Sequence, residues 1–70
     1  MTQCEQILHH LRNEGTITQR EAARRYDIYR LAARIYDLRR EGHQIEKEME
    51  TSETGKQYAR YHLNQLALEI

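Results

Sequence analysis

Apolar side chains near the start of the chain recur every three or four residues, which is the spacing of one face of an α-helix. The first such set is Cys4, Ile7, Leu8 and Leu11. Thr2 and Glu5 have the spacing of a capping box, so this helix is predicted to begin directly after Thr2. Gly15 tolerates a left-handed backbone and is predicted to end it. Thr16-Ile17 should follow as a short extended link or first strand, with Ile17 in the core.

A second helix is predicted to start at Gln19, because Thr18 and Glu21 repeat the capping-box spacing. Its inner face is formed by small or apolar side chains, Ala22, Ala23 and Tyr26. A turn over residues 26–28 should come next, with the apolar side chain of Ile28 buried between two helices.

The third helix is expected from about Tyr29 to Glu41, and Gly42 should end it. Its buried stripe consists of Leu31, Ile35 and Leu38. Helices as short as the second and third are unstable in isolation, so both are expected to depend on tertiary packing.

From His43 onward, polar and apolar residues alternate with the period of a β-strand. Residues 45–50 and 58–63 show this alternation, and residues 51–56 between them have the composition of a turn. This pattern predicts a β-hairpin. The apolar positions of residues 64–70 fit a helix or a strand, and they are candidates either for closing the core or for self-association.

The predicted order is helix, short strand, helix, helix, strand, strand, which is the order of a small α+β winged helix-turn-helix. We expect one domain over residues 1–70, with the helix-turn-helix at 18–42, the wing hairpin at 43–63 and a tail at 64–70.

Composition limits the class of protein. A hydrophobic content of 39% is sufficient for one small core. The single cysteine, Cys4, excludes an internal disulfide and fits a reducing compartment. No apolar run approaches the roughly 18 residues of a spanning helix, and the N-terminus lacks the pattern of a signal peptide. A cytoplasmic protein without membrane contact is therefore expected.

Charge is balanced overall but unevenly distributed, with 11 Lys and Arg against 11 Asp and Glu. Residues 20–40 contain seven arginines and three acids, whereas residues 41–54 contain five glutamates and one lysine. The basic segment coincides with the predicted helix-turn-helix and favours DNA as a partner. The acidic segment coincides with the first hairpin strand and favours a protein partner.

In a helix-turn-helix, the second helix of the motif enters the DNA major groove. The side of the third helix opposite its buried stripe is therefore predicted to face DNA. Candidate contacts on or beside this face are Tyr29, Arg30, Ala33, Arg34, Asp37 and Arg40. Ala33 would permit close approach, and arginine pairs with guanine or phosphate. Arg34 flanks the buried stripe and either binds DNA or pairs with a neighbouring acid.

The second helix is expected to cross the DNA backbone, with candidate phosphate contacts at Arg20 and Arg24. Thr18 and Gln19 lie at its N-terminus, where backbone amides favour an anion. Lys56 is the candidate contact in the wing turn. The alternative for all of these charged residues is an ordinary solvated surface.

The acidic residues of the hairpin, Glu46, Glu48 and Glu50, share one face of the first hairpin strand. They predict either a solvated strand face or a surface that binds a protein. Such a face departs from wings that carry basic residues to the DNA backbone.

No pattern indicates catalysis or a metal site. The histidines are His9, His10, His43 and His62, and the adjacent pair diverges by about 100° on a helix. There is no Gly-rich phosphate loop and no paired carboxylate motif. We therefore expect no metal, cofactor, small-molecule substrate or enzymatic activity.

Three segments carry a resemblance to a known family: ILHHLRNEGTITQREAARRYDI, RLAARIYDLRREGHQIE and GKQYARYHL, which together span residues 7–63. In their order and spacing they resemble the winged helix-turn-helix domains of small bacteriophage and prophage proteins. The resemblance implies binding to double-stranded DNA, in transcriptional regulation or as an accessory of recombination.

Two functions are therefore predicted from the sequence. The first is a small sequence-specific DNA-binding protein whose third helix occupies the major groove, acting as a homodimer or with neighbouring proteins. The alternative is a winged helix that binds a host or phage protein through Glu46, Glu48 and Glu50.

Overall fold

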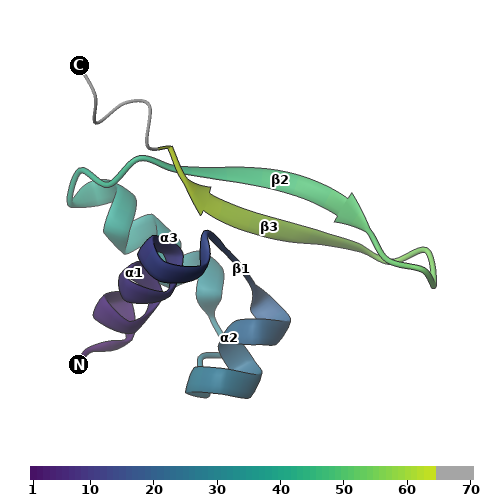
Figure 1. The fold of residues 1–70 in the computed structure, drawn as a ribbon, viewed down its shortest axis with the longest axis horizontal. Helices are drawn as coiled ribbons and strands as arrows, with labels where there is room; N and C mark the ends of the chain where they lie inside the picture. Colours follow the sequence, from purple (N-terminus) through teal and green to yellow (C-terminus); the bar gives the residue numbers. More distant parts are fainter. Residues whose placement is uncertain (65–70) are drawn as a thin grey trace.

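The computed structural model of the protein describes residues 1–64 (Figure 1). Helix α1 spans Gln3–Glu14 and begins at the predicted capping box. The Glu5 amide donates to Thr2 Oγ1 at 3.1 Å, and the Thr2 amide donates to Glu5 Oε1 at 3.0 Å. At the other end, Gly15 adopts a φ of 91°. Both predicted ends of the first helix are confirmed.

Helix α2 spans Gln19–Tyr26 and starts at the second predicted capping box. The Thr18 amide donates to Glu21 Oε1 at 3.1 Å, and the Glu21 amide donates to Thr18 Oγ1 at 3.3 Å. Asp27 ends the helix in the left-handed conformation, with a φ of 56°. The predicted start of this helix is therefore confirmed.

Helix α3 spans Leu31–Arg40, so the prediction that it begins at Tyr29 is wrong. Arg30 is the N-cap residue, with a φ of −123° and a ψ of 63°, and its side chain makes no capping hydrogen bond. Tyr29 and Arg30 thus belong to the turn before the helix rather than to its outward face.

The physical reason for the late start is the side chain of Gln19. Its amide group donates to the carbonyl oxygen of Ile28 at 2.8 Å, and its Oε1 accepts from the Leu31 amide at 2.9 Å. These two bonds hold residues 28–30 outside the helix and supply a partner for an amide that the helix itself leaves unpaired.

The strands form one antiparallel sheet in the order β1-β3-β2. Their bounds are Thr16–Thr18 for β1, Ile45–Thr51 for β2 and Gln57–Leu63 for β3. The predicted hairpin and the short first strand are both confirmed. We call the hairpin of β2, β3 and the turn 52–56 the wing. In the described part of the chain, β1 pairs only with residues 60–62 of β3, so the rest of the wing extends away from the helices as a two-stranded arm (Figure 1).

The core lies where the three helices meet one face of the sheet. It consists of Ile7, Leu11, Ile17, Ala22, Ile28, Leu31, Ile35, Leu38, Ile45 and Tyr61. The buried stripe predicted for the third helix and the predicted burial of Ile28 are confirmed. Apolar burial of this kind is the main favourable term in folding.

His10 is buried among these apolar residues, which the sequence did not predict. Its Nε2 lies 3.0 Å from the carbonyl oxygen of Thr16, and its Nδ1 lies 2.7 Å from the Tyr26 hydroxyl. Since a carbonyl oxygen only accepts, Nε2 donates to Thr16. The Nδ1 atom also lies 3.3 Å from Glu14 Oε2. The imidazole therefore links α1, β1 and α2 through satisfied hydrogen bonds.

The predictions for the tail concern residues that, apart from Asn64, lie outside the described part of the chain. Asn64 itself is anchored, because its amide donates to the carbonyl oxygen of Gln44 at 2.8 Å. Within residues 1–64, none of the helices is long and apolar enough to cross a membrane.

Candidate nucleic-acid interface

The solvent-facing side of α3 is rotated relative to the predicted one. Leu31, Ile35 and Leu38 are buried as expected. The exposed positions of the helix are Ala32, Tyr36, Arg39 and Arg40. By contrast, Ala33 and Asp37, which were predicted to face DNA, are half-buried.

Helix α1 packs against α3, and its Cys4 lies beside Arg34 and Asp37. Burial, and to a smaller extent the carboxylate of Asp37, raises the pKa of the Cys4 thiol. Asp37 also accepts an ion pair from Arg34, with Nη2 and Oδ2 3.2 Å apart. Of the two predicted roles for Arg34, the structure thus shows pairing with a neighbouring acid.

Tyr36 and Arg40 stand together on the exposed side of α3. The Tyr36 side chain is 60% exposed, and the Arg40 guanidinium lies 5.8 Å from the centre of its ring. The other exposed arginine, Arg39, donates through Nε to the carbonyl oxygen of Ile45 at 3.0 Å and so is tied to the start of β2. Within residues 1–64, Arg40 has no ion pair with an acid.

The turn before α3 adds two further exposed side chains, Tyr29 and Arg30. Tyr29 is 74% exposed, and among residues 1–64 its hydroxyl makes only a long contact of 3.5 Å, with Asp27. The turn and the exposed side of α3 therefore present two tyrosines and two arginines to solvent without burying them in the fold.

The N-terminal region of α2 contains both structural and exposed residues. The side chains of Thr18 and Gln19, both predicted to contact phosphate, are occupied in the capping box and in the turn before α3. Arg20 and Arg24 are exposed, one helical turn apart. Arg25 instead pairs with Glu14 of α1 at 2.5 Å, and this bond raises the pKa of Arg25.

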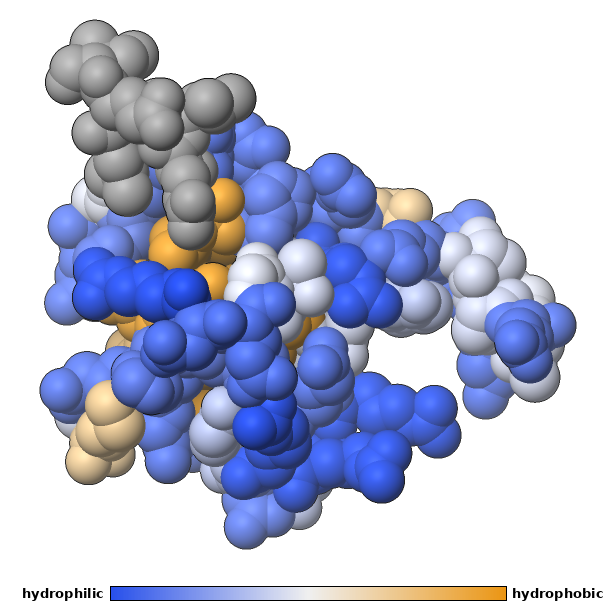
Figure 2. Space-filling view, viewed as in Figure 1, coloured by the Kyte–Doolittle hydropathy of each residue, from blue (hydrophilic) through white to orange (hydrophobic). Residues whose placement is uncertain are grey.

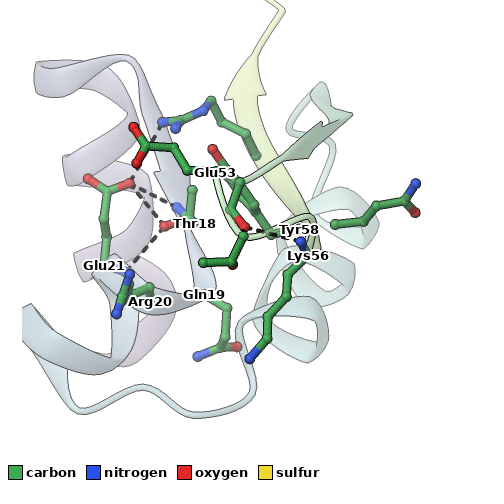
Figure 3. Close-up of a pocket in the computed structure, with 11 residues that line it drawn as sticks. Thr18, Gln19, Arg20, Glu21, Glu53, Lys56 and Tyr58 are labelled. Carbon is green, nitrogen blue, oxygen red and sulfur yellow. Dashed lines mark hydrogen bonds and ion pairs between the residues drawn. The ribbon is translucent and has the colours of Figure 1, made fainter.

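A groove of about 890 Å³, lined by polar and charged residues, separates the N-terminus of α2 from the wing. Figure 2 shows a hollow between the wing and the helices, in a surface that is mainly hydrophilic in this view. Figure 3 shows Thr18, Gln19 and Arg20 on the α2 side, and Lys56 and Tyr58 on the wing side. The groove thus brings together four residues that the sequence predicted as DNA contacts: Thr18, Gln19, Arg20 and Lys56.

The acidic residues of the wing are largely paired within the sheet. Glu46 contacts His62 Nε2 at 3.3 Å and accepts from Asn64 Nδ2 at 2.9 Å. Glu50 accepts from Arg60 Nε at 2.6 Å and from the Tyr58 hydroxyl at 3.1 Å. The Glu48 side chain makes no hydrogen bond or ion pair with another residue of 1–64. The acidic run is therefore partly neutralised by β3, which the sequence alone did not show.

Sequence reasoning missed two residues that organise this interface. Arg60 was not among the predicted contacts, and Gln19 was predicted only as a residue at a helix N-terminus. The strand register could have indicated the first, because Arg60 and the glutamates share one face of the sheet. No signal in the sequence indicates the bridging role of Gln19.

Comparison with known proteins identifies the family. The family model described as a winged helix-turn-helix domain matches residues 2–66, which is nearly the whole chain. No curated protein and no solved structure matches the chain. The order of helices and strands along the chain and the order of strands in the sheet both agree with this family match. Winged helix-turn-helix domains are in general DNA-binding modules. The chain belongs to the winged helix-turn-helix domain family.

Proposed function

We propose that the protein binds a specific sequence of double-stranded DNA, with the exposed side of α3 in the major groove. The observation that supports this most directly is the pair Tyr36 and Arg40, which is exposed beside the solvent-facing Ala32. A small residue next to an aromatic ring and a guanidinium permits close approach to base edges. Tyr29 and Arg30 extend the same surface from the turn.

We assign contact with the DNA backbone to Arg20 and Arg24 on α2 and to Lys56 in the wing turn. All three side chains are exposed, and Arg20 and Lys56 line opposite sides of the groove. Phosphate contacts of this kind fix the position of a protein on DNA without selecting a sequence. We do not assign a base contact to Ala33, Arg34 or Asp37, because they are half-buried beside α1.

The resemblance to small bacteriophage proteins favours a role in transcriptional regulation or as an accessory of recombination. A module of this size covers only about 600–1,000 Å² of protein surface on DNA. We therefore propose that it acts as a homodimer or beside a second DNA-bound protein.

The alternative, a protein-binding acidic wing, has less support. Two of its three glutamates are engaged by His62, Arg60 and Tyr58. Only Glu48 combines exposure with the absence of a partner among residues 1–64.

Selection from random-sequence duplex DNA, followed by binding across a salt series, tests the proposal. We expect selection to enrich a sequence motif. We also expect the logarithm of the association constant to fall linearly with the logarithm of the salt concentration. The control is Arg12→Ala, which removes an exposed arginine from α1 outside the proposed surface. Binding without enrichment would contradict sequence specificity. Absence of binding would contradict DNA as the partner and favour Glu48 and a protein.

A further inference from the structure

Arg60 lies at the point where the wing leaves the body of the protein. In the sheet register it faces Thr18 on β1 and Glu48 on β2. Nearer the wing turn, β3 pairs only with β2 among residues 1–64. Within these residues the two-stranded arm has no other support from the sheet, so its direction relative to α2 depends on contacts at this position.

The guanidinium of Arg60 joins the wing to the body. On the wing side, Nε donates to Glu50 Oε1 at 2.6 Å, and the group lies 5.8 Å from the ring centre of Tyr58. On the body side, Nη1 donates to Thr16 Oγ1 at 3.1 Å and lies 4.0 Å from Glu21 Oε1. That carboxylate oxygen also accepts from the Thr18 amide in the capping box of α2. One side chain therefore contacts residues of β1, β2, β3 and α2.

Arg60 is poorly placed to contact DNA itself. Its side chain is 31% exposed, and both Nε and Nη1 already donate to protein oxygens. Contacts with Tyr58 and then Glu50 raise the pKa of Arg60, so the group stays charged at any ordinary pH. A planar guanidinium with several donors suits a junction of this kind, whereas a lysine supplies a single point charge.

We propose that Arg60 is a positioning residue, which fixes the direction of the wing relative to the N-terminus of α2 so that Arg20 and Lys56 contact the same DNA backbone. This inference rests on the proposed function. Arg60 acts through Glu50, its shortest contact on the wing side at 2.6 Å. Removing that acid therefore weakens DNA binding, although the loss of a negative charge alone would strengthen it.

The direction of the wing is measured without DNA, from distances between spin labels on Glu53→Cys in the wing turn and Arg24→Cys on α2, in a Cys4→Ser background. We expect one narrow distance distribution for the native network and a broad one for Arg60→Gln and for Glu50→Gln. The matched control is Glu48→Gln, which removes the neighbouring charge and should leave the distribution narrow. An unchanged width in Glu50→Gln overturns the proposal, and this variant keeps the test valid should Arg60→Gln not fold.

DNA binding provides the second test, through the slope of log affinity against log salt concentration. Lys56→Ala should lower the magnitude of this slope by about 0.9, the value of one phosphate contact. In the Arg60→Gln background the same substitution should change the slope very little, since the wing no longer holds Lys56 against DNA. If Arg60 itself bound a phosphate, the two losses would add to about 1.8, which overturns the positioning role.

The remaining comparison separates charge from position. Glu50→Gln should weaken DNA binding and Glu48→Gln should not; tighter binding for both would show that only net charge matters and overturns the inference. A native protein that binds no DNA contradicts the proposed function instead. In that case, the label distances still decide whether Arg60 holds the wing.

Discussion

The side chain of Gln19, the first residue of α2, receives the amide of Leu31, the first residue of α3, in a hydrogen bond of 2.9 Å. The same side chain donates to the carbonyl oxygen of Ile28 in the intervening turn at 2.8 Å. One amide group thus determines where α3 begins and connects it to the start of α2. A residue that the sequence suggested for phosphate binding is instead part of the scaffold of the helix-turn-helix.

The first prediction follows from these two bonds. Gln19→Ala leaves a backbone carbonyl and a helix N-terminal amide without their partner, so we expect it to lower the free energy of unfolding by about 1–3 kcal/mol. Urea denaturation followed by circular dichroism measures the change. The control is Gln3→Ala, at an exposed position in the first turn of α1. Equal stability of the two variants would contradict the role assigned to Gln19.

The second prediction concerns the buried imidazole. His10→Leu replaces the imidazole by an apolar side chain of similar size and removes the partners of the Thr16 carbonyl and the Tyr26 hydroxyl. We expect a loss of about 1–3 kcal/mol in the free energy of unfolding. The neighbouring exposed histidine supplies the control, because His9→Leu should change stability by no more than about 0.5 kcal/mol. If His10→Leu is as stable as native protein, apolar packing fully replaces the contribution of these hydrogen bonds, which contradicts the prediction.

Local patterns predicted most of the fold. The capping boxes at Thr2 and Thr18 identified the starts of two helices, because a hydroxyl and a carboxylate three residues apart satisfy amides within one turn. The change from helical to alternating periodicity identified the hairpin. These features depend only on residues close together in the sequence, so the sequence alone specifies them.

Long-range contacts limited the prediction of the site. The exposed side of α3 depends on where α1 packs, and a helical projection centred on the buried stripe alone contains no information on that neighbour. Thus Ala33 and Asp37 were predicted on the exposed side but are half-buried, whereas Arg40 is exposed as predicted. Likewise, the pairing of Glu50 with Arg60 requires the strand register, which fixes partners across the hairpin.

The third prediction is a loss of stability in acid that involves Glu5. The backbone hydrogen bond with Thr2, and then the bond with its hydroxyl, lowers the pKa of Glu5 below its usual value of about 4.5. A carboxyl group whose pKa is lowered by folding stabilises the protein above the unfolded-state pKa. That contribution disappears as the pH falls through the lower, folded-state pKa.

Comparing native protein with Glu5→Gln isolates this contribution, since other titrating groups act equally in both. We expect native protein to be the more stable at pH 7 and the difference to vanish near pH 2, in urea titrations at each pH. A difference of the same size at both pH values would show that the charge of Glu5 is not responsible.

The last prediction compares Tyr36 and Arg40, which are exposed on α3, with Asp37, which was predicted to face DNA but is half-buried. Tyr36→Ala and Arg40→Ala should each weaken binding to the selected DNA by about 1–3 kcal/mol and relax the preference at one position of the motif. Both side chains are exposed, so the free energy of unfolding should remain within about 0.5 kcal/mol of the native value. Asp37→Ala should disturb the ion pair with Arg34 without changing the preferred motif. Should Asp37→Ala alter the motif while Tyr36→Ala does not, the face beside α1 contacts the bases, and α1 must move when DNA binds.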